Sequence, residues 1–171
     1  HYDWFNKARR GMSLKGAKKG VDLMPHEKGF FWSGVASGMD NSPRFIDRDA
    51  LRVDAIAQQG LSALYVARMA KRIGNNDLEA KFQAEYDRIK ALINRYYWDE
   101  KDGIYYDIKP GDGSFVRVKT PAAFWPMLAE MCSPEQAKRL AEHARDPQVF
   151  GGPVPWPSVA RSDPNFDGNY W

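Results

Sequence analysis

The sequence predicts an all-α fold made of antiparallel helical hairpins, with a small β-hairpin inserted between them. Two long segments, residues 50–73 and 77–97, carry apolar side chains at the spacing of one helix face. Only the three residues 74–76, Gly-Asn-Asn, separate these segments, and a turn of that length joins antiparallel helices. A further helical region begins near residue 120, after a stretch in which polar and apolar residues alternate.

The chain before the first long helix has a different character. We expect residues 2–10 to form a short helix, and residues 11–30, which are rich in glycine and lysine, to form a long loop. Asp47 or Asp49 is placed to cap the helix over 50–73, because a carboxylate accepts hydrogen bonds from the free N–H groups at a helix start.

The second long helix should begin at Asp77, because Gly74 and the two asparagines after it tolerate the left-handed conformation that ends a helix. Apolar residues recur in it every three or four positions, which predicts one buried stripe. The stripe consists of Leu78, Phe82, Tyr86, Ile89, Leu92 or Ile93, and Tyr96.

A small β-hairpin is expected next. Residues 99–103 are acidic and end in glycine, which predicts a turn. The residues 103–108 alternate enough to predict a short strand. A second strand over 115–118 would pair with it across the Pro-Gly-Asp-Gly segment at 110–113.

Two more helices complete the pattern. The third is expected over 120–131. The fourth should start after Ser133 and run to about residue 144, because a serine cap, a proline at the first position and Gln136 at the third form a strong start signal. Residues 146–169 are rich in proline and should be irregular.

The composition is that of a globular chain. Apolar residues make up 43% and aromatic residues 13% of the 171 residues, which argues against disorder and allows one domain with a core. A net charge of +3 is too small to indicate nucleic-acid binding. No apolar run approaches the ~20 residues of a membrane span. Cys132 is the only cysteine, so no internal disulfide forms, and cytoplasm and periplasm both stay open as compartments.

No metal or cofactor site is predicted. His1, His26 and His143 show no metal-ligand spacing with one another or with Cys132. The acidic segment 99–107 does not match a calcium-binding loop. We therefore expect no cofactor.

The segment 34–45 is the candidate functional site. Its one carboxylate, Asp40, is followed by a proline that stiffens the backbone and by Arg44, and two aromatic residues, Phe31 and Trp32, precede it. Cleavage of a glycosidic bond needs a proton donor and flat apolar surfaces for sugar rings. By spacing alone, the Asp-Asn-Ser-Pro string is also typical of an Asx-turn or a helix cap.

Residues 37–44 read Ser-Gly-Met-Asp-Asn-Ser-Pro-Arg. This string closely resembles the acid loop of glycoside hydrolase family 63 and, more distantly, that of the trehalases, which share an (α/α)6 toroid. The segments 53–59, 97–99 and 103–107 also look like landmarks of that family. Many relatives have glutamate before the serine, where this chain has Ala36. The resemblance implies that the helical hairpins form part of an (α/α)6 toroid.

The resemblance also implies a mechanism. In the family, the aspartate of this string is the general acid of an inverting hydrolysis, which puts that role on Asp40. The base is a glutamate in a segment after a Tyr-Trp landmark, and the last two residues of this chain match that landmark. We therefore assign no base here, and we expect Glu27, Glu130 and Glu142 to be helix-surface or loop residues.

Other candidate site residues surround this acid. Asn41 and Arg44 would shape its environment, and Arg44 is expected to point at sugar hydroxyls or at a structural carboxylate. Asp54 is either a solvated helix residue or a buried partner that orders the acid loop. The candidates for stacking against sugar rings are Trp32, Trp125, Trp156 and Trp171.

Both ends of the chain look like cuts within a domain. Residues 1–5 read as the tail of a helix, and residues 168–171 read as the entry into a further segment. We therefore expect 1–171 to be a portion of one glycosidase catalytic domain, with missing flanking segments of the same enzyme as its partners.

The predicted function is hydrolysis of α-glycosidic bonds in small α-glucosides or related oligosaccharides by an inverting mechanism. The alternative is a non-catalytic helical domain that binds carbohydrate or protein. A lyase or epimerase built on an α-toroid is disfavoured, since such enzymes typically use histidine or tyrosine bases and no histidine is near the acid loop in the sequence.

Overall fold

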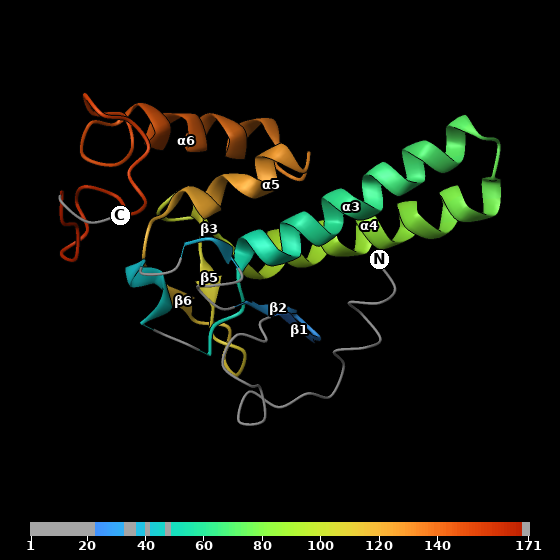
Figure 1. The fold of residues 1–171 in the computed structure, drawn as a ribbon, viewed down its shortest axis with the longest axis horizontal. Helices are drawn as coiled ribbons and strands as arrows, with labels where there is room; N and C mark the ends of the chain where they lie inside the picture. The colour runs from blue at the N-terminus through green and yellow to red at the C-terminus, as the bar shows by residue number, and fades with distance from the viewer. Residues whose placement is uncertain (1–22, 33–36, 40–41, 47–48, 169–171) are drawn as a thin grey trace.

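The main feature of the computed structural model is an antiparallel hairpin of two long helices, α3 (Val53–Arg72) and α4 (Asn76–Tyr96). The hairpin extends as an arm from the rest of the molecule, and the shorter elements gather at its base (Figure 1). The structure describes residues 23–32, 37–39, 42–46 and 49–168.

The turn between the helices follows the expected chemistry. Gly74 adopts the left-handed conformation with φ 72°, which ends α3 at little steric cost. Asn75 caps α4, since its side chain accepts a hydrogen bond of 3.1 Å from the N–H of Leu78. The buried face of α4 contains the central part of the predicted stripe: Phe82, Tyr86, Ile89 and Ile93.

Short strands close the base of the arm. Leu51 exchanges two backbone hydrogen bonds with Ile108, of 2.8 and 3.1 Å, and the N–H of Arg52 donates to the carbonyl of Phe30 over 2.8 Å. The chain just before α3 therefore lies between two antiparallel strand pairs. These pairs are β1 (Leu23–His26) with β2 (Gly29–Trp32), and β5 (Asp107–Ile108) with β6 (Phe115–Val116); β3 (Trp98–Asp99) and β4 (Ile104–Tyr105) form a third pair.

The C-terminal part adds one long helix and two short ones. Helix α6 (Pro134–Arg145) begins with the predicted capping box, in which Ser133 accepts from the N–H of Gln136 and the Gln136 side chain accepts from the N–H of Ser133. The helix η2 (Pro121–Phe124) runs directly into α5 (Trp125–Leu128). Residues 146–168 contain no helix or strand, as expected.

One continuous core joins these elements. Leu51, Ile56, Ile89 and Ile93 are among its fully buried members, together with Tyr97. Trp98 packs against this core, and its ring meets Tyr105 edge to face at 4.8 Å between ring centres. The core therefore fixes the base of the arm, where the strands and the start of α3 meet.

Several local predictions were wrong at the N-terminal side. Part of the expected loop over 11–30 forms the hairpin of β1 and β2, in which residues 23–26 pair with 29–32. The α3 helix begins at Val53, and neither Asp47 nor Asp49 is its N-cap, which is Arg52. The expected helix over 2–10 lies outside the described residues.

The other differences concern element type and boundaries. The expected strand over 103–108 is split: its first part pairs back onto β3, and only its second part pairs with residues 115–116. The expected helix over 120–131 is a 3-10 turn followed by a single α-turn, and Glu130 then turns the chain with φ 58°. Helix α4 begins one residue before Asp77.

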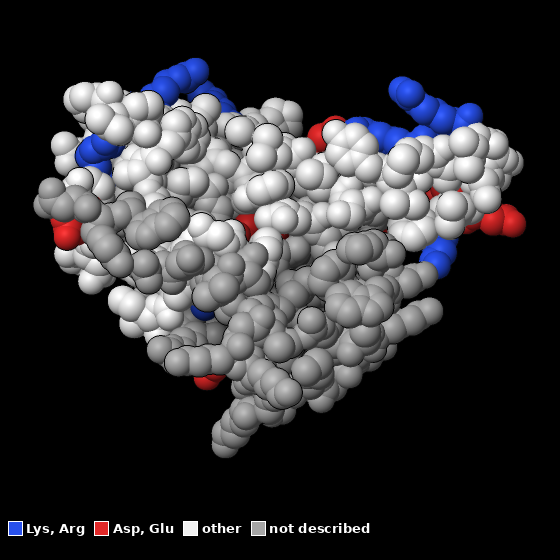
Figure 2. All heavy atoms as spheres, in the orientation of Figure 1, with Lys and Arg blue, Asp and Glu red and all other residues white. Residues whose placement is uncertain are grey.

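The surface mixes both charges. On the face in Figure 2, the Lys and Arg side chains lie in separate groups with uncharged surface between them. Within the described ranges, no helix is both long enough and apolar enough to cross a bilayer.

Gly60 allows α3 to pack closely against its neighbours. A Cβ atom at this position would collide with Cε of Met131 and come within 2.8 Å of Cγ2 of Ile89. Gly60→Ala should therefore lower the free energy of unfolding by about 1–3 kcal/mol, although helix propensity alone favours alanine by about 1 kcal/mol. Urea unfolding measures this change. Ser62→Ala, on the exposed side of the same helix, should stay within about 0.5 kcal/mol of the wild type. A Gly60→Ala protein more stable than the wild type would contradict the packing argument.

Candidate active site

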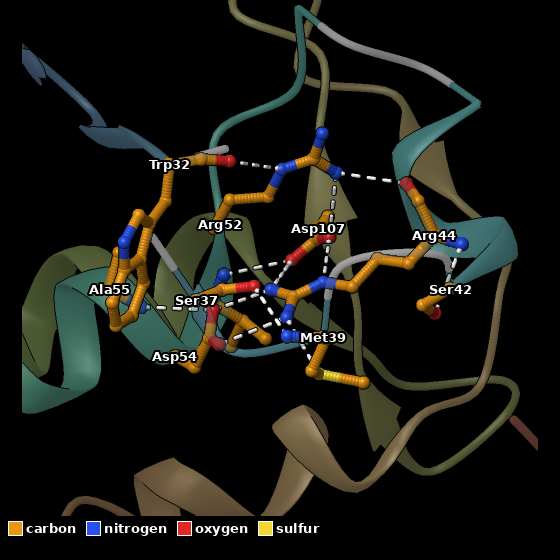
Figure 3. A network of polar contacts seen from close by, with 10 residues as sticks. Trp32, Ser37, Met39, Ser42, Arg44, Arg52, Asp54, Ala55 and Asp107 are labelled. Atoms are coloured by element: carbon orange, nitrogen blue, oxygen red, sulfur yellow. Dashed lines mark hydrogen bonds and ion pairs between the residues drawn. The ribbon is translucent and has the colours of Figure 1, made fainter. Parts of the chain in front are cut away.

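Four segments that are far apart in the sequence meet at the start of α3. They are the end of β2, the short helix η1 (Pro43–Phe45), residues 51–54 and strand β5. The backbone pairing of Leu51 with Ile108 sets Asp107, the residue before Ile108, beside the first turn of α3. Figure 3 shows the polar side chains of these segments pointing toward one another.

Arg44 lies at the centre of this cluster. Its Nε donates to Oδ2 of Asp107 over 2.6 Å and its Nη2 to Oδ1 over 2.8 Å. Its Nη1 donates to Oδ2 of Asp54 over 2.9 Å, and its Nη2 also donates to Oδ1 of Asp54. The guanidinium group thus binds two carboxylates, each through two nitrogen–oxygen pairs, which is the strongest and most directional form of this ion pair.

The remaining donor of Arg44 points at a sulfur atom. Its Nη1 lies 3.5 Å from Sδ of Met39. A guanidinium group has five N–H donors, and the five contacts of Arg44 account for all of them. Arg44 is also buried, with 1% of its surface exposed.

Asp107 holds three partners at once. Besides Arg44, its Oδ2 accepts from Nη1 of Arg52 over 3.0 Å, and its Oδ1 accepts from the backbone N–H of Val53 over 2.8 Å. Val53 is the first residue of α3, so Asp107 supplies the capping acceptor that Arg52, the N-cap residue, does not provide. The N-terminus of α3 is therefore capped by a carboxylate from strand β5, which is distant in the sequence.

Arg52 ties the cluster to the flanking segments. Its Nη1 also donates to the carbonyl of Arg44 over 3.0 Å, and its Nε donates to the carbonyl of Trp32 over 3.3 Å. Its guanidinium group lies 4.5 Å from the ring centre of Phe45, within cation–π range. Arg52 thereby links the end of β2 to η1.

The cluster is electrically balanced. Two arginines, Arg44 and Arg52, face two carboxylates, Asp54 and Asp107, and all four side chains are buried. Burial raises the pKa of Asp107, but Arg44 and Arg52 lower it by more, so this pKa lies below its ordinary value. Burial lowers the pKa of Arg44, but Asp107 and Asp54 together raise it above its ordinary value. Asp107 and Arg44 therefore keep their charges at neutral pH.

The sequence matches a family model over most of its length. Residues 21–171 match the model described as the mannosylglycerate hydrolase MGH1-like glycoside hydrolase domain. The chain belongs to this glycoside hydrolase family.

Relatives of this glycoside hydrolase domain are much longer than the chain. A protein of Borreliella burgdorferi, described as uncharacterized, is 31% identical over 136 residues, which is 75% of the chain and 27% of the relative. The cytosolic neutral trehalase of Kluyveromyces lactis is 34% identical over 79 residues, covering 46% of the chain and 10% of the trehalase.

Two solved structures share the fold of this domain. A protein described as a sialidase matches 96% of the chain and 14% of its own length, with a TM-score of 0.75 and 15% identity. The neutral trehalase Nth1 of Saccharomyces cerevisiae matches 75% of the chain and 25% of its own length, with a TM-score of 0.64 and 18% identity. The expected fold is confirmed: the helical hairpins are part of a trehalase-like six-hairpin glycosidase toroid.

The structure brings three of the candidate site residues of this glycosidase domain together. Trp32, Arg44 and Asp54 all belong to the cluster at the start of α3. Asp54 is buried and paired, which agrees with the second of its two expected environments. The other central candidates, Asp40, Asn41 and Trp171, lie outside the described residues.

The remaining tryptophans lie in another part of the domain. Trp125 begins α5 and is partly buried against the core. Trp156 is 49% exposed and adopts a left-handed backbone conformation with φ 60°. Its ring stacks on Phe150 and meets Phe124 edge to face, at 5.8 and 4.9 Å between ring centres. The exposed part of Trp156 is therefore held firmly by two other aromatic rings.

Two members of the cluster, Arg52 and Asp107, were not predicted as site residues. Asp107 closes the Gly-Ile-Tyr-Tyr-Asp segment that resembles a family landmark, and this was the available signal. Arg52 offered none, because a lone arginine before a helix is usually solvated.

The other carboxylates considered lie on the surface of the domain. Glu27, Glu130 and Glu142 are exposed, as expected, and Glu130 forms an ion pair of 2.6 Å with Arg68. Among the residues that the structure describes, no group of three or more His, Cys, Asp or Glu side chains is arranged to hold a metal ion.

Asp107 should make the stability of the domain sensitive to acid. Its pKa in the folded state is lowered, so its stabilising effect is complete above the unfolded pKa of about 3.9 and is lost as the pH falls below it. Asp107→Asn should cost about 3–5 kcal/mol at neutral pH, because two buried arginines would then face one carboxylate. The difference between variant and wild type should shrink below about pH 4.

Urea unfolding at a series of pH values measures this difference. Asp112→Asn, in an exposed turn, is the matched control and should change stability little. An Asp107→Asn protein as stable as the wild type at pH 7 would show that the buried pairs do not stabilise the fold.

Proposed function

We propose that the enzyme containing this chain hydrolyses α-glycosidic bonds with inversion, and that Asp40 is its general acid. The proposed substrates are small α-glucosides or related oligosaccharides. The chain belongs to a glycoside hydrolase family, and Arg44 follows Asp40 by four residues. The observation that carries the proposal is that all five N–H donors of Arg44 are directed at Asp54, Asp107 and Met39. If these donors were unoccupied, Arg44 would be expected to form an ion pair with Asp40.

A general acid must hold its proton until the glycosidic oxygen takes it. An arginine paired directly with Asp40 would lower the pKa of the acid, so the carboxyl group would be ionised at neutral pH. Because all five donors of Arg44 are directed at Asp54, Asp107 and Met39, none is left for Asp40 or for a sugar hydroxyl. We therefore assign Arg44 a positioning role instead of direct substrate contact.

The contacts of Arg44 also include the residues that flank Asp40 and Asn41 in the sequence. The side chain of Ser42 accepts a hydrogen bond of 3.3 Å from the N–H of Arg44, and Met39 touches the guanidinium group from the other side of the Asp40–Asn41 pair. Residues on both sides of the proposed acid are thus tied to one buried cluster. Such fixed geometry is what proton donation to a bound substrate requires.

The second carboxylate of the proposed mechanism is a glutamate base outside this chain. An inverting enzyme needs its two carboxyl groups ~6.5–9.5 Å apart, with a water molecule between base and sugar. The exposed Glu27, Glu130 and Glu142 do not suit this role. The chain spans 27% of the Borreliella relative, which leaves ample length for a base elsewhere in the enzyme. Trp32, Trp125, Trp156 and Trp171 remain the proposed sugar-stacking residues.

Replacing Asp40 tests the proposed acid. Asp40→Asn in the complete gene product should lower kcat by about 10³-fold or more, because the leaving oxygen is no longer protonated. The assay is hydrolysis of a panel of α-linked disaccharides, with polarimetry to follow the anomer released. The Asp112→Asn variant should hydrolyse the same sugars at the wild-type rate. Near-normal turnover by Asp40→Asn would exclude the role, and glycan binding without turnover by the wild type would favour the non-catalytic alternative.

Replacing Asp54 tests the positioning role of Arg44. Asp54→Asn removes one negative charge that balances the guanidinium group. On the proposed role, this excess of positive charge should lower the pKa of Asp40. The basic limb of the kcat/KM profile should move to lower pH by about one unit, with kcat reduced about tenfold. The pH profile of Asp112→Asn should be unchanged. If Asp54→Asn lowered stability without moving its pH profile, Asp54 would have a structural role alone.

A further inference from the structure

A groove lies between the end of α4 and the start of α6. Its volume is about 610 Å³, which is within the range of about 300–1,000 Å³ that is usual for sites of small ligands. The described residues that line it include none of the cluster at the start of α3. We call it the α4–α6 groove, and its lining residues include Lys90, Asn94, Trp98, Glu100, Glu135 and Arg139.

Asn94 fixes the two sides of the groove relative to each other. Its Nδ2 donates to the carbonyls of Lys90 and Met131 over 2.9 and 3.0 Å. Its Oδ1 accepts from the hydroxyl of Tyr105 over 2.7 Å. The amide therefore joins α4 to the segment that leads into α6, so the groove is formed in advance and a ligand need not order it.

Trp98 gives the groove an aromatic surface that is also held in place. Its Nε1 donates to Oε2 of Glu100 over 2.6 Å, and its ring packs on the edge of Tyr105. The guanidinium group of Arg139 lies 5.7 Å from the centre of the Trp98 ring and donates to the carbonyls of Glu100 and Lys101 over 2.6 and 3.0 Å. A fixed indole with polar groups beside it is a surface on which a sugar ring can pack.

The charges around the groove favour a neutral ligand. Lys90 and Arg139 line it together with Glu100 and Glu135, so an anion would meet two carboxylates and a cation would meet two basic groups. Among the described residues, the Lys90 ammonium group donates one hydrogen bond, of 3.0 Å to the carbonyl of Glu130, which leaves two of its three donors for a ligand. The groove therefore offers donors and acceptors together, as hydroxyl groups require.

Two other classes of occupant fit the groove less well. A phosphate group would find few N–H donors at the start of α6, because the N–H of Gln136 is bound to Ser133 and Pro134 has none. A stable protein interface buries about 800 Å² on each partner. In the part of the chain that the structure describes, no large exposed apolar side chain lines the groove to anchor such an interface.

We propose that the α4–α6 groove binds a short neutral oligosaccharide as a second, non-catalytic carbohydrate site. Sugar rings present apolar C–H faces, which suit the indole of Trp98, and hydroxyl groups, which suit the balanced donors and acceptors around it. The proposal rests on the groove and does not depend on Asp40 or on the reaction assigned to it.

Cys132 can report whether the groove is occupied, because it lines the groove and is the only cysteine of the chain. Burial raises the pKa of its thiol, so labelling with iodoacetamide is done at alkaline pH, where more thiolate is present. The complete gene product is labelled with and without maltotetraose or cellotetraose, and mass spectrometry of the peptide that contains Cys132 reads the rate. At a sugar concentration about tenfold above its Kd, the rate should fall about tenfold.

Two variants of the groove test where the sugar binds. Lys90→Ala removes a charged donor and Trp98→Phe removes part of the aromatic surface, so each should raise the Kd read from the labelling about tenfold. Lys81→Ala, at an exposed position of α4, is the matched control and should leave the Kd unchanged. Hydrolysis of α-linked disaccharides should proceed at the wild-type rate in all three variants, which separates this site from the proposed catalytic one.

Three outcomes would overturn the proposal. Labelling of Cys132 that neither sugar slows would show that the groove binds no oligosaccharide. Protection that stays unchanged in both Lys90→Ala and Trp98→Phe would place the bound sugar elsewhere. Protection by pyrophosphate without protection by either sugar would make the groove an anion site. Two variants are used because Trp98 also packs against the core, so one poorly folding protein does not decide the result.

Discussion

The buried ion pair between Arg44 and Asp107 is the constraint on which the rest of this structure depends. It joins the last residue of the string 37–44 to a strand more than sixty residues away. The same carboxylate supplies the cap of α3, so helix start, strand and loop share one acceptor. A buried charge left without its partner is strongly unfavourable, and this makes the relative positions of the three segments hard to change independently.

The balance of charges explains how such a polar cluster is tolerated inside a core. Each buried carboxylate meets a guanidinium group through matched donors and acceptors, and this geometry offsets the loss of hydration. All N–H donors of Arg44 are engaged, so its position is fixed and its charge is balanced by Asp54 and Asp107. That combination agrees with the proposed role of Asp40, four residues earlier in the sequence, because a general acid needs rigid surroundings and a pKa that is not lowered.

The two helices of the long hairpin expose different kinds of side chain. The outer face of α4 is suited to water, since its exposed positions are polar, charged or small. On the outer face of α3 and at its C-cap, Tyr65, Met69 and Ile73 are exposed. The two sides of the hairpin therefore differ: large apolar side chains are exposed on the α3 side, and polar, charged or small residues are exposed on the α4 side.

The elements that depend on neighbours along the chain could be located from the sequence. Helical spacing located α3 and α4, and the Ser133 capping box located α6, because these signals act within a few residues. The eight-residue string 37–44 indicated the family. The members of the cluster at the start of α3 became known from the structure, since Asp107, 54 residues from Val53, caps the helix in place of the expected local residue. Contacts over that separation depend on how the strands pair, and no local spacing encodes them.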